Sequence, residues 1–312
     1  MQDLTVTKAK PFLKWAGGKR QLLSQYENFF PSELKEGKID KYIEPFVGSG
    51  AVFFHIASKY DVNEFYISDV NADLILSYKT IKEDVDSLVN LLNEYQKEYH
   101  SLNKDDQIKR YYGVRKRYNE KLIGFDYKNF SDDWVERTAQ TIFLNRTCFN
   151  GLFRVNSKGE FNVPIGRYKN PTICDEENLR EVSNLLEDTI IEWADYTVSQ
   201  KYADSDTFVY FDPPYLPISE TSHFTSYSKE SFGRKEQEEL AEFFGELHNS
   251  GAKLMLSNSD PTNVNPDDTF FPDNYNHPEF KIVPVNASRM INSMKEKRGV
   301  IRELIIINYE NI

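Results

Sequence analysis

Two strand-like runs, each followed by a helical segment, place the strongest constraint on the fold of this chain. Lys41–Phe46 has the character of a short strand, a glycine-containing turn follows it, and Ala51–Tyr60 has the pattern of a helix. A second strand ends at Asp69, and a second helical segment follows it. Alternating strands and helices are typical of a parallel sheet whose faces are covered by helices. The sequence therefore predicts an α/β fold.

The middle of the chain interrupts this alternation. From about Glu83 to Thr147 the segments are long, polar and helical, and a β-hairpin is expected next, with FRVN and EFNVP joined by Ser157-Lys158-Gly159. Sheet-forming segments then return, so we predict one α/β domain of residues 1–83 and 179–312, interrupted by an insertion at 84–178. The later strands are expected at DTIIEW, TFVYF, KLMLSN, FKIVPV and ELIIINY, with a helix over Arg234–His248.

The charges of the chain are unevenly distributed. A net charge of −11 argues against a general affinity for nucleic acid. Basic side chains nevertheless gather in residues 109–121, 145–171 and 288–302. A single basic run is most often a solvated helix face, whereas three runs on an acidic chain favour a groove for a polyanion.

Composition disfavours several other classes of protein. The chain has no apolar run of about 18 residues or more, so no membrane span is expected, and its first residues lack the apolar core of a signal peptide. The cysteines, Cys148 and Cys174, are too few for a structural zinc site and a poor disulfide framework, which indicates a reducing, cytoplasmic setting. The histidines are scattered, so no metal site is expected.

The glycine turn EPFVGSG is a candidate ligand-binding loop. Gly48 and Gly50 would let backbone N–H groups approach a ligand at the N-terminus of a helix. Asp69 follows at about the 20-residue spacing at which an acid meets ribose hydroxyls in nucleotide-binding folds. Glu44 ends the strand, and the third glycine of the dinucleotide pattern is absent. These features favour a ligand with an adenosine moiety and no pyrophosphate, such as S-adenosylmethionine, although the glycines could equally serve the turn alone.

A second loop, in PFLKWAGGKRQLL, offers groups for the rest of such a ligand. Gly17-Gly18 would permit a close backbone approach, Lys19 could pair with a carboxylate, and Trp15 could pack against a cationic or apolar group. A methionine moiety presents a carboxylate and a sulfonium. The alternative is a helix cap with a solvent-exposed lysine.

The run VYFDPPYLP ends a strand abruptly and holds an acid beside an aromatic ring. Proline has no N–H to donate, so Asp212-Pro213-Pro214-Tyr215 is expected where a strand leaves the sheet. An amine conjugated to an aromatic ring is a poor nucleophile, and acceptors for its protons let its lone pair face an electrophile. Asp212 and the Pro213 carbonyl could accept these protons, and Tyr215 could stack on a base extruded from a duplex. A plain turn is the weaker alternative.

Four motifs together carry a resemblance to a known family. KWAGGK, EPFVGSG, RTCFNGLFRVNSKGEFNVPIGRYKNP and DPPY follow in the order found in Dam-type DNA adenine-N6 methyltransferases, and the similarity covers nearly the whole chain. The resemblance implies a Rossmann-like methyltransferase sheet, mostly parallel with a late antiparallel strand, and an inserted helical and β-hairpin DNA-recognition domain. It also implies methyl transfer from S-adenosylmethionine to a flipped-out adenine of double-stranded DNA, usually in GATC.

The resemblance also assigns roles to individual residues. The catalytic motif is Asp212, Pro213, Pro214 and Tyr215. The residues expected at the cofactor lie in the two glycine loops and at strand ends: Trp15, Gly18, Lys19, Glu44, Phe46, Gly48, Gly50, Asp69, Asp195, Tyr196 and Asp212. The residues expected at DNA lie before the first loop and in the hairpin region: Lys14, Phe149, Asn150, Leu152, Arg154, Pro164 and Arg167.

Some of these expectations are more specific than others. Phe149 falls where the family inserts a side chain between bases, although a core aromatic would have the same appearance. Arg154 is the best candidate for a bidentate contact to guanine. FTSYSKESF, with Phe224 and Tyr227, could be a flap over the target base, and SRMINSMKEKRG a loop near phosphates, but both also fit ordinary surface loops.

Three alternatives stay open at this level. Related enzymes methylate amino groups of RNA or protein, and a longer palindrome containing GAT could replace GATC. A DNA-binding protein without turnover is a third alternative, which the intact Asp212, Tyr215 and Lys19 disfavour. A cognate restriction endonuclease acting on the same site is a partner that the resemblance allows, in a prokaryotic cytoplasm.

Overall fold

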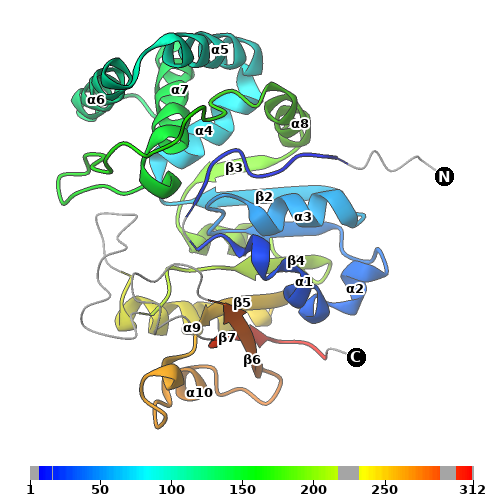
Figure 1. Cartoon of the computed structure of the whole chain (residues 1–312). Coiled ribbons are helices and arrows are strands. Elements are labelled where there is room, and N and C mark those ends of the chain that lie inside the picture. Colours follow the sequence, from blue (N-terminus) through cyan, green and yellow to red (C-terminus); the bar gives the residue numbers. More distant parts are fainter. Residues whose placement is uncertain (1–6, 16, 217–231, 289–299, 311–312) are drawn as a thin grey trace.

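A single mixed sheet forms the centre of the molecule. The computed structural model describes residues 7–15, 17–216, 232–288 and 300–310 (Figure 1). Within them, seven strands form one sheet in the order β3-β2-β1-β4-β5-β7-β6. Strands β1 to β5 run parallel, and β7 is antiparallel to both β5 and β6, which confirms the predicted fold class. The strands are β1 (Lys41–Glu44), β2 (Glu64–Asp69), β3 (Ile190–Trp193), β4 (Thr207–Phe211), β5 (Lys253–Ser259), β6 (Lys281–Ser288) and β7 (Val300–Ile307).

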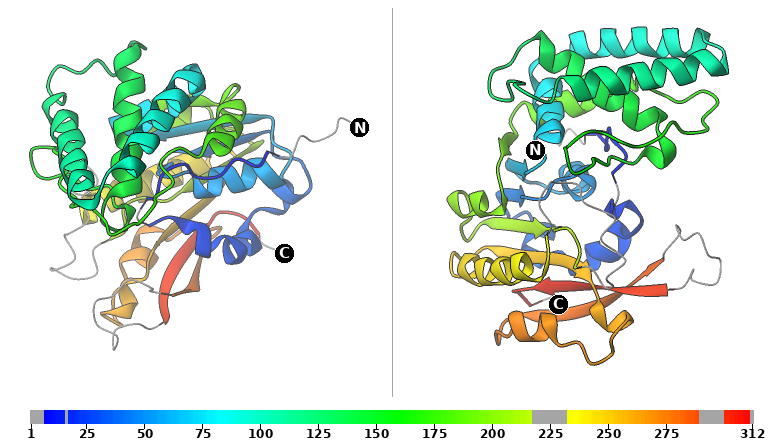
Figure 2. Two further views of the ribbon diagram at one scale, coloured as in Figure 1. Left: turned by 45° about the horizontal axis from the view of Figure 1, so that its top comes forward. Right: turned by 90° about the vertical axis from the view of Figure 1, so that its left-hand side faces the viewer.

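Helices cover both faces of the sheet, which is why its central strand is apolar throughout. All residues of β4 are buried: Phe208 and Tyr210 face one core, and Val209 and Phe211 face the other. Figure 2 shows α9 on one face and α1 to α3 on the opposite face. The helices are α1 (Leu23–Tyr26), α2 (Ser32–Lys35), α3 (Ala51–Lys59), α4 (Ala72–Glu83), α5 (Val85–Ser101), α6 (Lys104–Glu120), α7 (Asp132–Thr147), α8 (Glu176–Leu186), α9 (Arg234–His248) and α10 (Phe270–Asn274).

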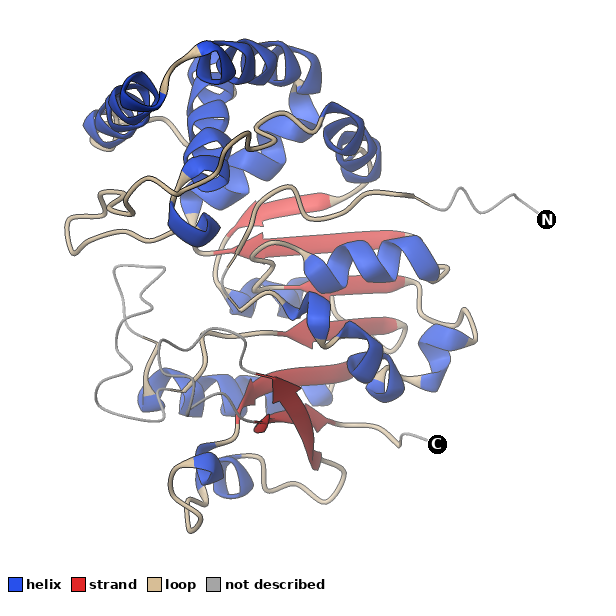
Figure 3. Ribbon diagram, in the orientation of Figure 1, coloured by secondary structure: helices blue, strands red, loops and turns tan. Residues whose placement is uncertain are grey.

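Helices α5 to α7 form a helical layer beyond the β3 edge of the sheet (Figures 1 and 3). Both α5 and α6 pack on α7, and α4 packs on α7 and α8. Between α7 and α8 the chain forms a short 3-10 helix (Phe149–Gly151) and then loops. No helix in the described part of the chain is long and apolar enough to cross a membrane.

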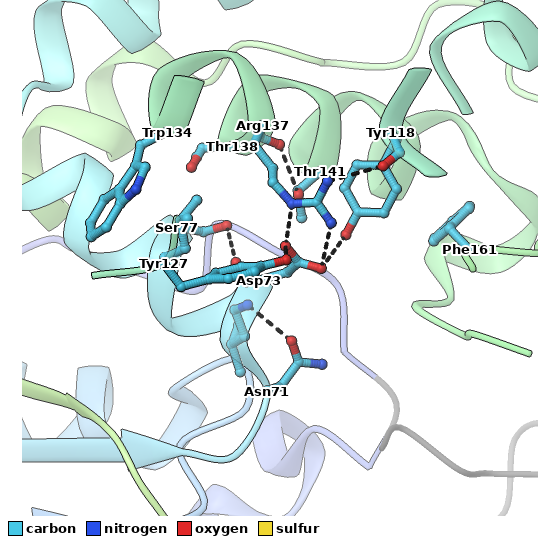
Figure 4. A network of polar contacts seen from close by, with 12 residues as sticks. Asn71, Asp73, Ser77, Tyr118, Tyr127, Trp134, Arg137, Thr138, Thr141 and Phe161 are labelled. Atoms are coloured by element: carbon cyan, nitrogen blue, oxygen red, sulfur yellow. Dashed lines mark hydrogen bonds and ion pairs between the residues drawn. The ribbon is translucent and has the colours of Figure 1, made fainter. Parts of the chain in front are cut away.

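A buried ion pair joins α4 to this helical layer (Figure 4). Nε of Arg137 on α7 lies 2.5 Å from Oδ1 of Asp73 on α4, and its terminal nitrogen lies 3.0 Å from the other oxygen. Tyr118 and Tyr127 each donate a hydroxyl hydrogen bond to the same carboxylate, at 2.7 and 3.0 Å. The guanidinium is 1% exposed, so these contacts satisfy a charge that water cannot reach.

The predicted hairpin forms a chain reversal without regular strands. Its pairing is limited to isolated antiparallel bridges, one of which joins Val155 and Phe161. Side chains take several of the backbone groups that a ladder would use: Asn156 accepts from the N–H groups of Lys158 and Glu160, and Asn119 on α6 accepts from Phe161. Such side-chain bonds compete with strand pairing, which explains why the predicted strands are shorter here.

Candidate active site

The acidic residues singled out from the sequence converge at one edge of the sheet. Asp69 ends β2, and Asp212 follows the last residue of β4 directly. Both strands run parallel to β1, so their carboxyl ends meet at the same edge. In open α/β sheets this edge is the usual place for a ligand. The arrangement of strands therefore brings together motifs that are far apart in the sequence.

The Asp212 carboxylate is held by a lysine and a serine. Nζ of Lys19 lies 2.7 Å from Oδ1 of Asp212, and the Ser257 hydroxyl on β5 donates to the same oxygen at 2.9 Å. Burial raises the pKa of Asp212 above its ordinary value, and the pairing with Lys19 acts against this increase. The other oxygen, Oδ2, accepts no hydrogen bond from the described residues, so it is the oxygen that a substrate amine could use.

Tyr215 lies against the same lysine. Nζ of Lys19 is 4.4 Å from the centre of the Tyr215 ring, which is within range of a cation–π interaction. The Tyr215 hydroxyl donates to Glu303 on β7 at 2.6 Å, and Tyr26 donates to the same oxygen at 2.8 Å. Burial raises the pKa of Tyr215 well above its ordinary value, so the side chain stays a neutral phenol.

Neighbouring side chains fix the backbone of the DPPY motif. Gln237 on α9 donates to the Pro214 carbonyl at 2.8 Å, and Asn258 on β5 accepts from the Leu216 N–H at 3.1 Å. Asn258 also donates to the Gln237 side chain at 3.0 Å, so both amides are fixed in orientation. The loop is thus positioned by β5 and α9 as well as by its own prolines.

The glycine loop is stabilised by the acid at the end of β2. The Gly48 N–H donates to Asp69 at 3.1 Å, and the Asn71 N–H donates to the other oxygen at 2.9 Å. Burial raises the pKa of Asp69 to about 6, although these N–H groups lower it. Gly50 has a φ of 70°, and a Cβ there would lie 2.7 Å from the Tyr78 hydroxyl. Gly50 is therefore required by the turn and its packing.

Aromatic side chains line the loops at this edge. Trp15 stacks on Phe153 with ring centres 5.2 Å apart, and a Cβ on Gly48 would lie 3.0 Å from the indole. Phe46 stacks on Tyr196, with 5.6 Å between the ring centres.

The remaining residues predicted at the cofactor lie in and below these loops. Glu44 is 2% exposed and accepts from the Tyr42 hydroxyl at 2.6 Å, so it lies below the surface of the site. Asp195 accepts from the Thr197 N–H at 2.9 Å and so caps the 3-10 helix Tyr196–Lys201. The Gly18 N–H donates to the Trp15 carbonyl at 3.3 Å, which closes the turn before Lys19.

The segment after α7 presents an exposed aromatic side chain. Phe149 is 50% exposed, so the alternative of a core aromatic is wrong. Asn150, with a φ of 56°, shares a short 3-10 helix (Phe149–Gly151) with it. The Phe149 N–H donates to the Pro164 carbonyl at 2.8 Å, and Arg154 donates to the Asn162 side chain at 2.8 Å.

Other residues predicted at DNA border this segment. Leu152 is partly buried, whereas Pro164 and Arg167 are exposed. Nζ of Lys14 lies 4.7 Å from the centre of the Tyr168 ring. The segment therefore has an exposed surface with polar, cationic and aromatic groups.

The first basic cluster is largely neutralised, which weakens the charge argument made from the sequence. Acidic neighbours from α5, α6 and α7 pair with its side chains, mostly at the surface. The pairs are Lys109 with Asp106, Arg110 with Glu98, Lys116 with Glu120, and Lys121 with Asp133 and Glu136.

Sequence reasoning missed Ser257, Glu303, Gln237 and Asn258, because each belongs to an element without a recognisable motif and reaches the site through tertiary pairing. The suggested flap with Phe224 and Tyr227, and the basic loop after Ser288, lie outside the described residues. Among the described residues, no group of three or more His, Cys, Asp or Glu side chains could hold a metal ion.

Comparisons with known proteins show which family the chain belongs to. Residues 15–291 match the family model described as "D12 class N6 adenine-specific DNA methyltransferase". The "Type II methyltransferase M.MjaIII" of Methanocaldococcus jannaschii is 52% identical over 302 residues, which are 96% of this chain and 99% of that protein. The "Type II methyltransferase M1.LlaDCHI" of Lactococcus lactis is 38% identical, over 97% of this chain and 96% of its own length. The "DNA adenine methylase" of Haemophilus influenzae is 34% identical, over 96% and 94%. The chain belongs to the D12 class of N6 adenine-specific DNA methyltransferases, enzymes that use S-adenosylmethionine as the methyl donor.

Proposed function

We propose that this enzyme methylates N6 of an adenine flipped out of duplex DNA, within GATC or a longer palindrome that contains GAT. The observation that carries the proposal is the pairing of Asp212 with Lys19 beside the Tyr215 ring, at the carboxyl edge of the sheet. Three relatives are named "DNA adenine methylase" or "Type II methyltransferase", which supports the chemistry and leaves the target sequence open.

The chemistry follows from the environment of Asp212. Oδ1 is occupied by Lys19 and Ser257, so Oδ2 is the acceptor for an N6 proton. A hydrogen bond from N6 to Oδ2 weakens the conjugation of N6 with the adenine ring and directs its lone pair at the methyl group, and N6 loses one proton after it has been methylated. The Pro213 carbonyl, which no longer belongs to a strand, can accept a hydrogen bond from the second N–H of N6. Tyr215, fixed through Glu303, offers its ring for stacking, which is worth about 1–3 kcal/mol per base.

The residues at the strand ends fit S-adenosylmethionine. Asp69 can accept from ribose hydroxyls, Phe46 and Tyr196 with Asp195 suit the adenine, and Trp15, Gly18 and Lys19 suit the methionine moiety. Gly48 and Gly50 allow the backbone of the glycine loop to lie close to the cofactor, and Glu44 supports this loop from below. When bound, the cofactor supplies an electrophilic methyl group on its sulfonium. The protein's own residues orient the acceptor amine and exclude water.

We further propose that residues 84–178 form the target-recognition unit and that residues 1–83 and 179–312 form the catalytic unit. The helical layer at the β3 edge and the exposed segment after α7 support this division. Lys14, Phe149, Asn150, Leu152, Arg154, Pro164 and Arg167 are the proposed DNA contacts. Two relatives are named type II methyltransferases. These names support the proposal that the enzyme acts in a prokaryotic cytoplasm beside a cognate restriction endonuclease.

The proposal is tested by sequencing methylation-free plasmid DNA, with detection of modified bases, after incubation with enzyme and cofactor. N6-methyladenine in a single motif is the expected result and also identifies the site. In the Arg154→Ala variant we expect methylation at sites with one changed base pair, because a bidentate guanine contact contributes about 1–3 kcal/mol of discrimination.

Lys158→Ala is the matched control for Arg154→Ala, because Lys158 is an exposed cation in the turn of the same hairpin. It is expected to weaken DNA binding with no change of motif, as loss of a phosphate contact does. Unmodified plasmid despite confirmed cofactor binding would contradict the proposed function. If Arg154→Ala methylated the same motif as the wild-type enzyme, only the base contact proposed for Arg154 would be wrong.

Cofactor affinity is expected to fall below a pH of about 6 because of Asp69. The fold raises the pKa of Asp69 to about 6, so the native state binds a proton at this carboxylate more tightly than the unfolded chain does. Its contribution to stability is present below the unfolded pKa and is lost as the pH rises through about 6. Binding to ribose hydroxyls instead requires the carboxylate, so affinity should drop by up to about tenfold per pH unit below 6.

Calorimetric titration with S-adenosylhomocysteine between about pH 5 and pH 8 measures this dependence. Asp69→Asn is the comparison: it should bind weakly at every pH, without the loss near pH 6. If the affinity of the wild-type enzyme did not change between about pH 5 and pH 8, the proposed dependence of cofactor binding on the Asp69 carboxylate would be wrong.

A further inference from the structure

Two asparagines from different helices hold the N-terminal segment in the same manner. Asn178 on α8 accepts from the Lys10 N–H and donates to the Lys10 carbonyl, both at 3.0 Å. Asn145 at the end of α7 accepts from the Lys14 N–H and donates to the Lys14 carbonyl, both at 2.8 Å. Each amide thus pairs with one residue as a neighbouring strand would. In Figure 1 the segment passes beneath α8 on its way to the sheet.

Asn145 differs from Asn178 in one respect. Its Nδ2 also donates to the Gly151 carbonyl at 3.0 Å. The amide is 1% exposed and therefore links two chain segments without competition from water. One of them contains Lys14, and the other is the exposed segment that begins at Phe149. Both segments contain proposed DNA contacts.

The two linked segments also pack directly on each other. Gly151 has a φ of 64°, and a Cβ on it would lie 2.3 Å from Cδ and 2.9 Å from Cβ of Lys14. No larger residue fits there without displacing Lys14. The stem of the Lys14 side chain therefore packs directly on the Gly151 backbone.

The next residue extends the connection to the catalytic loops. Trp15 stacks on Phe153 of the same DNA-facing segment, and it also lies against Gly48 of the glycine loop. Lys19, four positions further on, pairs with Asp212. A shift of Lys14 relative to Gly151 would therefore also move Trp15. Through Trp15 it would move the residues that orient the acceptor amine.

We propose that Asn145 is a specificity-determining positioning residue. It fixes Lys14 relative to the Phe149–Arg154 segment, so that the two sets of base contacts act on one target. This inference rests on the proposed function. Asn145 touches neither substrate nor cofactor in this role, and it acts through Lys14 and Gly151.

The test compares Asn145→Ala with the matched variant Asn178→Ala. Both remove the amide that pairs with the N-terminal segment, but only the first also removes the hydrogen bond to the Gly151 carbonyl. The measured quantity is the ratio of kcat/KM for a duplex with the mapped site to kcat/KM for duplexes with one base pair changed. We expect this ratio to fall about tenfold or more in Asn145→Ala, and to stay unchanged in Asn178→Ala.

Gly151→Ala approaches the same contact from the other side and leaves the Asn145 amide intact. It should lower the ratio as Asn145→Ala does, because the added methyl group displaces Lys14. If Asn145→Ala fails to fold, Gly151→Ala still tests the inference.

Two results would overturn the inference. One is an unchanged ratio in Asn145→Ala or Gly151→Ala, and the other is an equal fall in Asn178→Ala, which would indicate only general support of the N-terminal segment. Failure of the proposed function is a different result: the wild-type enzyme would then form no N6-methyladenine on any duplex.

Discussion

Asp212→Ala is expected to lower the rate of methyl transfer by about 10³-fold or more while DNA binding is largely retained. The variant removes the acceptor for the N6 proton, so the lone pair of the amine stays conjugated with the ring. It also leaves Lys19 without its partner at 2.7 Å. Binding should persist because contacts to phosphates provide most of the affinity for DNA. Single-turnover transfer and fluorescence-detected DNA binding measure the two effects separately.

Asp206→Ala is the matched control for this prediction. Asp206 precedes the first residue of β4, at the opposite end of the strand from Asp212, and its side chain is exposed. The control should transfer methyl groups at the wild-type rate. Asp212→Asn keeps an acceptor oxygen but removes the charge, so it should transfer methyl groups faster than Asp212→Ala and more slowly than the wild-type enzyme. Wild-type turnover in Asp212→Ala would show that the Asp212 side chain is not the acceptor.

Motifs at the ends of strands were the most predictable part of this protein. Parallel strands bring their carboxyl ends to one edge, so recognising β1, β2 and β4 was enough to bring Gly48, Asp69 and Asp212 together. The prolines after Asp212 fixed the end of β4 for a local reason, the absence of an N–H group. The helix Arg234–His248 was predicted with its observed bounds, because its apolar spacing is regular.

Residues whose roles depend on partners far away in the chain could not be predicted. Glu303 meets Tyr215 only because β7 inserts between β5 and β6, and no local pattern around Glu303 indicates this pairing. Asn145 likewise lies in an ordinary helix, and its partner Lys14 comes from the start of the chain. The basic run in α6 appeared cationic because its acidic partners include residues of α5 and α7.

The ion pair between α4 and α7 belongs to the same class of long-range contacts and is expected to have the largest effect on stability. Arg137→Ala should lower the free energy of unfolding by about 3–5 kcal/mol, as breaking a buried pair from one side does. Among the described residues, the variant leaves the Asp73 carboxylate with only the hydroxyls of Tyr118 and Tyr127, in a place that water reaches poorly. Urea-induced unfolding, followed by circular dichroism, measures the change.

Arg180→Ala is the matched control, because Arg180 also makes two ion-pair contacts with carboxylates but is 45% exposed. Exposed pairs are solvated whether or not they form, so the control should change stability little. The double variant Asp73→Asn, Arg137→Met should recover part of the loss, since it removes the charge that the single variant leaves unpaired. Equal destabilisation by Arg137→Ala and Arg180→Ala would contradict the argument, because burial is what separates the two arginines.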